Sequence, residues 1–313
     1  TELAHQYGEV AGRARYYSIP LHGFVPSANA QVDRRLHWSA GISAPFAQPP
    51  STLEQRRCEG TLFGPTVNKV TICNYVTPSV VRAVEWAGSL TPELPHLYLS
   101  SGRDELIDKS VRLLRYQRKE AETCLSFQGC YMGHTSATAR SISCQSVHQQ
   151  GEAIFDWPSI PHPEDDVIAS LTALDEAVTN AGGSSKILGL FVEPVGERSG
   201  KVIDQSRAKA LNEWSKRHQI PLVGVETASA YRRCYETDFA YQSIGLDIDL
   251  LAWWPGGQTG FLHTSPTYFI AKPLMMVSTW DGDELSMIRF HHQSMAVTAE
   301  NRSDRLTAQS KVF

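Results

Sequence analysis

The sequence predicts an α/β fold in which helices flank a mostly parallel sheet. From about residue 67, short apolar runs alternate with amphipathic segments, which is the pattern of consecutive βα units. Residues 250–254 form an unbroken apolar run, Leu-Leu-Ala-Trp-Trp. Parallel strands covered on both faces have this composition, whereas strands with one solvent face alternate. We therefore expect a fully buried strand at this position.

The composition divides the chain into three regions. Residues 18–66 are rich in Pro, Gly and Ser, which favours an extended N-terminal arm over residues 1–66. The βα pattern occupies residues 67–283, and a final helix and polar tail are expected over residues 284–313. A chain of 313 residues can form two domains or one large α/β unit with appendages.

The first βα unit after the arm is expected around residue 100. Residues 97–100 form a candidate strand, and Ser101 followed by Asp104 resembles a capping box at the start of a helix. Three apolar residues at helical spacing would form the buried face of that helix: Ile107, Val111 and Leu114.

The remaining elements follow in the same alternating order. Residues 123–127, 187–192 and 221–225 are short apolar runs and predict three more strands. Asp204 is placed to cap a helix between the last two of these strands. A final helix is expected from near Asp283 to about residue 300.

Composition limits the classes of function. The formal net charge is −4, so no excess of cations points to nucleic acid. No apolar run approaches the ~20 residues of a membrane-spanning helix. The six cysteines show neither a CxxC pair nor zinc spacing, which predicts reduced thiols and no metal site. Because the chain starts at Thr1 without a methionine, we expect that any targeting peptide was removed or never included.

Four short segments occur in an order that resembles one enzyme family. They are Phe-Asp-Trp-Pro at 155–158, Phe-Val-Glu-Pro at 191–194, the loop at 245–249 and Ser-Thr-Trp-Asp-Gly-Asp at 278–283. Together they resemble class III aminotransferases, fold-type I enzymes that use pyridoxal phosphate, and are most similar to the 4-aminobutyrate aminotransferases. The resemblance spans roughly residues 60–298. It implies a fold-type I large domain with the C-terminal small domain largely absent; the alternative is a generic α/β sheet.

The resemblance implies a cofactor site in which several positions are retained. Ser101 and Gly102 match the turn that holds the cofactor phosphate, and Tyr131 matches the residue that stacks on the cofactor ring. Glu193 ends the Val-Glu strand, and Thr279 matches the residue that reaches the phosphate of the partner subunit. A strand-end ion pair and a helix cap also explain the last two residues, so their retention says little about function.

The positions that carry the chemistry differ from the family. Pyridoxal phosphate needs a lysine amine for its imine and an acid beside its pyridine nitrogen. The acid position falls on Val225, and the next ring contact of the family falls on Ala228. The lysine position falls on Trp254 or Pro255, depending on a one-residue gap, and the nearest downstream lysine is Lys272.

Bulky residues stand where the family has small residues and a lysine stem. Since cavities destabilise in proportion to their volume, we interpret Trp253, Trp254 and Pro255 as side chains that refill an empty pocket. The alternative is a platform of two tryptophans for an aromatic ligand. Cys130 with His134 has the residue types for nucleophilic catalysis, but we expect a structural thiol beside a surface histidine.

These observations favour a catalytically inactive aminotransferase homologue that holds neither cofactor nor metal. We expect a structural or interaction subunit of a larger protein assembly, paired as a homodimer or heterodimer through the large domain and without a nucleic-acid patch. By analogy, the expected location is mitochondrial, in a ribosome or respiratory assembly. Two alternatives stay open: an active transaminase in which Lys272 or another chain supplies the amine, and a small-molecule sensor built on Trp253 and Trp254.

Overall fold

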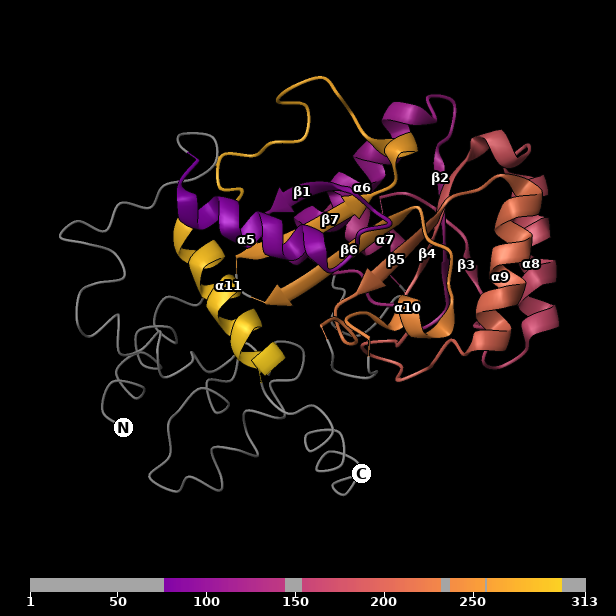
Figure 1. The fold of residues 1–313 in the computed structure, drawn as a ribbon. Coiled ribbons are helices and arrows are strands. Elements are labelled where there is room, and N and C mark those ends of the chain that lie inside the picture. Colours follow the sequence, from indigo (N-terminus) through magenta and orange to yellow (C-terminus); the bar gives the residue numbers. More distant parts are fainter. Residues whose placement is uncertain (1–75, 144–153, 232–236, 257, 300–313) are drawn as a thin grey trace, which may run out of the picture.

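The fold was obtained as a computed structural model, which describes residues 76–143, 154–231, 237–256 and 258–299 (Figure 1). The expected N-terminal arm and polar tail lie outside these ranges. In chain order the elements are α5 (Pro78–Ser89), β1 (His96–Ser100), α6 (Arg103–Gln117), β2 (Thr123–Phe127), α7 (Ala137–Ile142), β3 (Ser159–Ile160), α8 (Val167–Asn180), η3 (Ser184–Lys186), β4 (Ile187–Val192), α9 (Gln205–His218), β5 (Leu222–Glu226), α10 (Ala240–Ile244), β6 (Leu250–Gly256), β7 (Thr259–Thr264), η4 (Pro266–Tyr268) and α11 (Glu284–Ala299).

The seven strands form one sheet in the order β1-β7-β6-β5-β4-β2-β3. Neighbours from β3 to β6 pair in parallel, whereas β7 pairs antiparallel with both β6 and β1. Among the strands that the structure describes, only β7 therefore runs against the others. The predicted α/β fold with a mostly parallel sheet is confirmed, including the strands expected at 97–100, 123–127, 187–192 and 221–225.

The sheet separates two apolar cores. The helices α5, α8, α9, α10 and α11 pack on one face, and α6 and α7 pack on the other. Figure 1 shows α5 beside α11 at one end of the molecule and α8 beside α9 at the other end. Successive residues of a strand point to opposite faces, so each strand contributes to both cores.

The strand β6 shows how this alternation divides neighbouring residues. Leu251 and Trp253 point into the core beneath α11, whereas Leu250 and Ala252 point into the core beneath α6. Our expectation of a fully buried strand was wrong at one position, because Trp254 is only half-buried. The continuous apolar composition of β6 reflects cover on both faces of the sheet, although the neighbouring strand β7 is antiparallel to β6.

The helix α6 confirms its predicted apolar face but not its predicted cap. Its three predicted face residues are buried: Ile107, Val111 and Leu114. The N-cap residue is Gly102, which makes no side-chain capping bond, so the capping box of Ser101 and Asp104 was wrong. Glu105 instead reaches back to the amide of Ser101, and Asp104 turns toward a neighbouring loop.

Two other predicted helix starts are confirmed. The Asp204 side chain accepts a hydrogen bond from the amide of Arg207 at the start of α9. The Asp283 carboxylate accepts one from the amide of Ser286 at 3.1 Å, so α11 begins where expected. No helix within the described ranges combines the length and the apolar composition that a bilayer crossing requires.

Candidate functional site

The residues that the resemblance assigns to a cofactor gather at one edge of the sheet. Tyr131 follows β2, Glu193 follows β4, Val225 lies near the end of β5, and Trp254 lies in β6. These strands are parallel, so their carboxyl ends meet at the same edge. Open α/β sheets bind ligands at this edge. The turn of Ser101 that begins α6 follows the carboxyl end of β1.

A carboxylate of the chain itself occupies the turn before α6. Oε2 of Glu105 accepts hydrogen bonds from the amide of Ser101 at 2.9 Å and from its hydroxyl at 2.6 Å. Burial by itself raises the pKa of Glu105, but the bonds from Ser101 and the charge of Lys109 outweigh it and leave the pKa below its ordinary value. A helix N-terminus binds phosphate through free amides, and the amide of Ser101 is already used.

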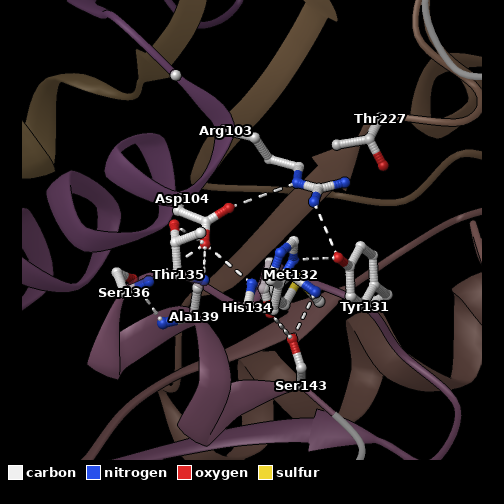
Figure 2. Close-up of polar contacts among 12 residues, drawn as sticks. Arg103, Asp104, Tyr131, Met132, His134, Thr135, Ser136, Ala139, Ser143 and Thr227 are labelled. Carbon is white, nitrogen blue, oxygen red and sulfur yellow. Dashed lines mark hydrogen bonds and ion pairs between the residues drawn. The ribbon is translucent and has the colours of Figure 1, made fainter. Parts of the chain in front are cut away.

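Asp104 occupies a second group of donors, in the loop after Tyr131 (Figure 2). Its Oδ2 accepts from the amides of His134 (2.9 Å), Thr135 (2.5 Å) and Ser136 (3.2 Å) and from the hydroxyl of Thr135 (2.6 Å). Burial raises the pKa of Asp104, but the donors of Thr135 and Ser136 and the charge of Arg103 outweigh it and lower the pKa. A Cβ at Gly133 would lie 2.3 Å from Asp104, so this packing requires glycine there.

Arg103 fills the space between the turns and the strand ends. Its Nη1 lies 3.1 Å from both carboxylate oxygens of Glu197, and its Nη2 donates to the hydroxyl of Tyr131 at 3.1 Å. Its Cζ lies 4.5 Å from the ring centre of Tyr131 and 5.6 Å from that of Trp254. The hydroxyl of Thr227 donates to Glu197 at 2.9 Å. Side-chain exposure is 13% for Arg103 and 4% for Glu197, so the ion pair is shielded from water.

The charge of Arg103 is stabilised by its neighbours. Burial alone would lower the pKa of Arg103, but Glu197, Tyr131 and Asp104 raise it above its ordinary value. The dipole of α6 disfavours a cation at this first helical position. The nearby acids therefore hold an arginine where the backbone would favour an anion.

Glu193 is a second buried acid at this edge, and it does not form the ion pair that we expected. Its carboxylate accepts hydrogen bonds from the amides of Tyr131 at 2.9 Å and Glu197 at 3.3 Å. Burial raises the pKa of Glu193 to about 8, although both hydrogen bonds oppose the shift. The strand-end ion pair is formed by Glu197, four residues later.

Tyr131 is buried and contacts two arginines and the exposed His134. The Cζ of Arg198 lies 4.4 Å from the ring centre of Tyr131. The hydroxyl of Tyr131 lies 2.6 Å from Nδ1 of the exposed His134. Arg103 donates to the same hydroxyl, so this oxygen contacts both the guanidinium and the imidazole (Figure 2). Cys130 is buried and donates to the carbonyl of Ile142 at 3.3 Å, which agrees with a structural thiol beside a surface histidine.

The strand β6 carries no amine at the expected lysine position. Trp254 is half-buried and Pro255 is buried, and neither side chain can form an imine. Val225 is buried in the core beneath α6, and Ala228 is half-buried just after β5. Lys272 is exposed on the segment between η4 and α11, outside β6.

Two further predicted site residues lie elsewhere. Trp253 is completely buried on the opposite face of the sheet, where it stacks on Phe261 with 4.7 Å between ring centres. Our interpretation of Trp253 as a side chain that refills the pocket was therefore wrong, because β6 alternates between its faces. Thr279 is exposed, and Asp283 caps α11 in its place.

The side chains present do not fit pyridoxal phosphate. The positions for the imine-forming amine and the pyridine-binding acid hold Trp254 or Pro255 and Val225. The amide of Ser101 binds the carboxylate of Glu105, and the face of Tyr131 binds guanidinium groups. Within the described ranges, no three His, Cys, Asp or Glu side chains are grouped to hold a metal ion.

Sequence reasoning missed the residue at the centre of this site. Arg103, Glu197, Arg198 and Thr227 were not singled out, because the comparison with a cofactor site drew attention to the retained positions. One signal was available: Arg103 follows Ser101 and Gly102 directly, at a helix start where a cation is unfavourable. Such a residue needs acidic partners, but sequence spacing alone does not identify Glu197.

Sheet order and site position together define the fold, and comparison with solved structures identifies it. A lysine aminotransferase from M. tuberculosis in the internal aldimine form is similar, with a TM-score of 0.71 and 18% identity, and the match covers 80% of this chain and 64% of that chain. A transaminase from the marine bacterium Virgibacillus has a TM-score of 0.69 and 17% identity, with 85% of this chain and 64% of that chain covered. An S-selective transaminase from Arthrobacter sp. has a TM-score of 0.70 and 12% identity, with 84% of this chain and 62% of that chain covered. The protein has the α/β fold of the fold-type I large domain.

The comparisons establish the fold and its extent. The chain spans 62–64% of the length of these three solved chains. No family model matches the sequence. Identities of 12–18% carry the fold alone, so the activity of these transaminases is not transferred with it.

Proposed function

We propose that this protein is a catalytically inactive aminotransferase homologue that serves as a structural or interaction subunit of a larger protein assembly. The observation that carries the proposal is the end of β6, where Trp254 and Pro255 stand at the lysine position. Transaminases act through an imine between cofactor and lysine, and neither side chain offers the amine. Val225 supports the proposal, because an acid is needed to keep the pyridine nitrogen protonated.

The internal contacts of the site also support the proposal. Glu105 and Asp104 use the backbone donors on both sides of the α6 start, and Arg103 covers the ring of Tyr131. Each contact stabilises the fold without a bound molecule. A fold maintained in this way can act through its surfaces, and large-domain aminotransferase folds already associate in pairs.

Spectroscopy and covalent trapping test the absence of cofactor chemistry. Purified full chain is incubated with pyridoxal phosphate, and its internal-aldimine absorbance is recorded before and after borohydride. We expect no band and no pyridoxyl-lysine in peptide mass spectra beyond the labelling of denatured protein. Lys272→Ala is the matched control, because it removes the amine of the alternative active enzyme. A band in the wild-type protein that disappears in Lys272→Ala would establish the alternative and refute the proposal.

Co-purification tests the assembly. We propose a mitochondrial location and protein partners, by analogy with the 4-aminobutyrate aminotransferases that the sequence resembles, and pairing of two copies or of this chain with a homologue. Tagged full chain should sediment above its monomer mass and retain a fixed set of proteins at stoichiometric ratio. A monomer without constant partners would refute the subunit function.

Thermal shift with vitamers and amino acids addresses the sensor alternative, for which a saturable rise in Tm is required.

A further inference from the structure

The side chains around Arg103 form a compact site for a planar cation. We define this cation site as Tyr131, Trp254, Glu197 and Thr227. Two aromatic rings lie 4.5 Å and 5.6 Å from the guanidinium carbon, and a shielded carboxylate lies 3.1 Å from Nη1. Thr227 donates to that carboxylate and orients it. Aromatic faces with an acid are the groups that recognise guanidinium ions.

We propose that this is a guanidinium-binding site and that Arg103 is its internal ligand. The inference deepens the proposed function and rests on it in one respect. Arg103 can lie on the ring of Tyr131 only if no cofactor ring lies there. The residues come from separate parts of the chain: Arg103 begins α6, Glu197 follows β4, Thr227 follows β5, and Trp254 lies in β6. Binding of Arg103 therefore ties the start of α6 to three strand ends.

The contacts require a planar guanidinium and not only a positive charge. Nη1 and Nη2 of Arg103 contact Glu197 and the Tyr131 hydroxyl at the same time, while Cζ lies near the Tyr131 ring. A lysine ammonium is a compact, strongly hydrated charge and cannot make these contacts together. Arg103→Lys should therefore keep the charge and lose most of the binding.

Chemical rescue provides the test. In Arg103→Ala the full chain should lose roughly 5–10 °C in Tm, because the shielded Glu197 loses its nearer cation and keeps only Arg198, at 3.9 Å. A tethered ligand acts at an effective concentration in the mM range, so roughly 50 mM methylguanidinium should restore at least half of the loss. Potassium chloride and urea at the same concentration should restore none of it. The Tm of Arg103→Lys should make up less than half of the Tm loss seen in Arg103→Ala, with or without methylguanidinium.

Matched variants separate the cation site from general effects of the added cation. Arg217→Ala removes an exposed arginine near the end of α9 and should show no methylguanidinium response. Arg103→Ala combined with Tyr131→Leu removes one wall of the site, so methylguanidinium should no longer raise the Tm. Retained rescue in that double variant would overturn the proposal. So would a loss below about 2 °C in Arg103→Ala, or equal rescue by potassium chloride.

A measurement on wild-type protein covers the case in which Arg103→Ala does not fold. In protein labelled with ¹⁵N-arginine, a bound guanidinium gives separate Nη signals because its rotation is hindered. We expect separate signals for Arg103 that disappear in Arg103→Lys and collapse in Glu197→Gln; the absence of such signals would overturn the inference. An aldimine in wild-type protein would refute the proposed function, whereas rescue would still establish the guanidinium site. The two failures are therefore distinguishable.

Discussion

Trp253 and Trp254 are neighbours in the sequence but lie in opposite kinds of environment. Trp253 is completely buried among aromatic rings, with the centre of Phe239 at 5.1 Å and that of Phe290 at 5.7 Å. Trp254 is half-buried on the other face, beside the guanidinium of Arg103. Trp253 therefore packs among neutral rings, whereas Trp254 lies beside a shielded ion pair at the edge of the other apolar core.

The polar groups follow the same division. On the neutral side, Nε1 of Trp253 donates to Nε2 of His263 at 3.0 Å, so the imidazole proton is on Nδ1, which lies 2.7 Å from the hydroxyl of Thr91. Burial lowers the pKa of His263 to about 3, which keeps the ring uncharged. On the charged side, Nη1 of Arg103 lies 3.1 Å from both carboxylate oxygens of Glu197, so each shielded ion has a counter-charge. Removing one group should therefore have different consequences on the two sides.

The largest effect is expected from Trp253→Ala. The substitution removes the largest ring of the aromatic core and leaves Nε2 of His263 without its donor. We expect a loss of about 3–5 kcal/mol in the free energy of unfolding, measured by urea denaturation. Trp253→Phe keeps most of the volume and should lose less than half as much. A loss below about 2 kcal/mol for the alanine variant would contradict the expectation that burial of this ring contributes most to stability.

Glu197→Gln should have the second largest effect. It leaves the shielded guanidinium of Arg103 without its main counter-charge, and we expect a loss of about 3 kcal/mol in the free energy of unfolding. The control is Glu120→Gln, which breaks an exposed pair with Lys186 and should change stability by less than about 0.5 kcal/mol. Equal losses in the two variants would show that the shielding of the first pair has no energetic role.

The pH dependence of stability tests the buried acids, which lie on both faces of the sheet. Burial raises the pKa of Glu193 to about 8, far above that of an unfolded glutamate, so the folded protein keeps a proton that the unfolded chain releases. Stability from this group is complete below about pH 4.5 and decreases as pH rises toward 8. Glu226, whose pKa burial raises to about 7, acts in the same direction.

Buried histidines act in the opposite direction and over a lower range. The pKa values of His162 and His263 are lowered by burial to about 4 and 3, so their stabilisation is lost as pH falls below about 6.5. Between pH 6.5 and 8 the acids should dominate, and unfolding free energy should fall by about 1–2 kcal/mol. Urea titrations at several pH values measure this slope. Glu193→Gln should flatten it, and an unchanged slope would exclude Glu193 as its source.

The sequence predicted the sheet better than the site, for a physical reason. Strands such as β4 and β5 are apolar runs whose burial depends on composition, which is visible locally. The cation site depends on a contact between Arg103 and Glu197, which are 94 residues apart, and no spacing rule connects them. The alternation of β6 was readable, but we applied the pocket interpretation to Trp253 and Trp254 together. A period of two assigns only one of them to each face.

The smallest effect is expected from Trp254→Leu, which tests whether this ring binds a cation or only covers the strand. The leucine keeps apolar cover over β6 but removes the ring face near Arg103, so we expect a loss of about 1 kcal/mol in the free energy of unfolding. The same substitution in an Arg103→Lys background should cost clearly less, because the guanidinium plane is already gone. Additive losses in this double-mutant cycle would mean that Trp254 contributes area alone. Coupling between the two residues would establish that adjacent tryptophans of one strand stabilise the fold by two different mechanisms.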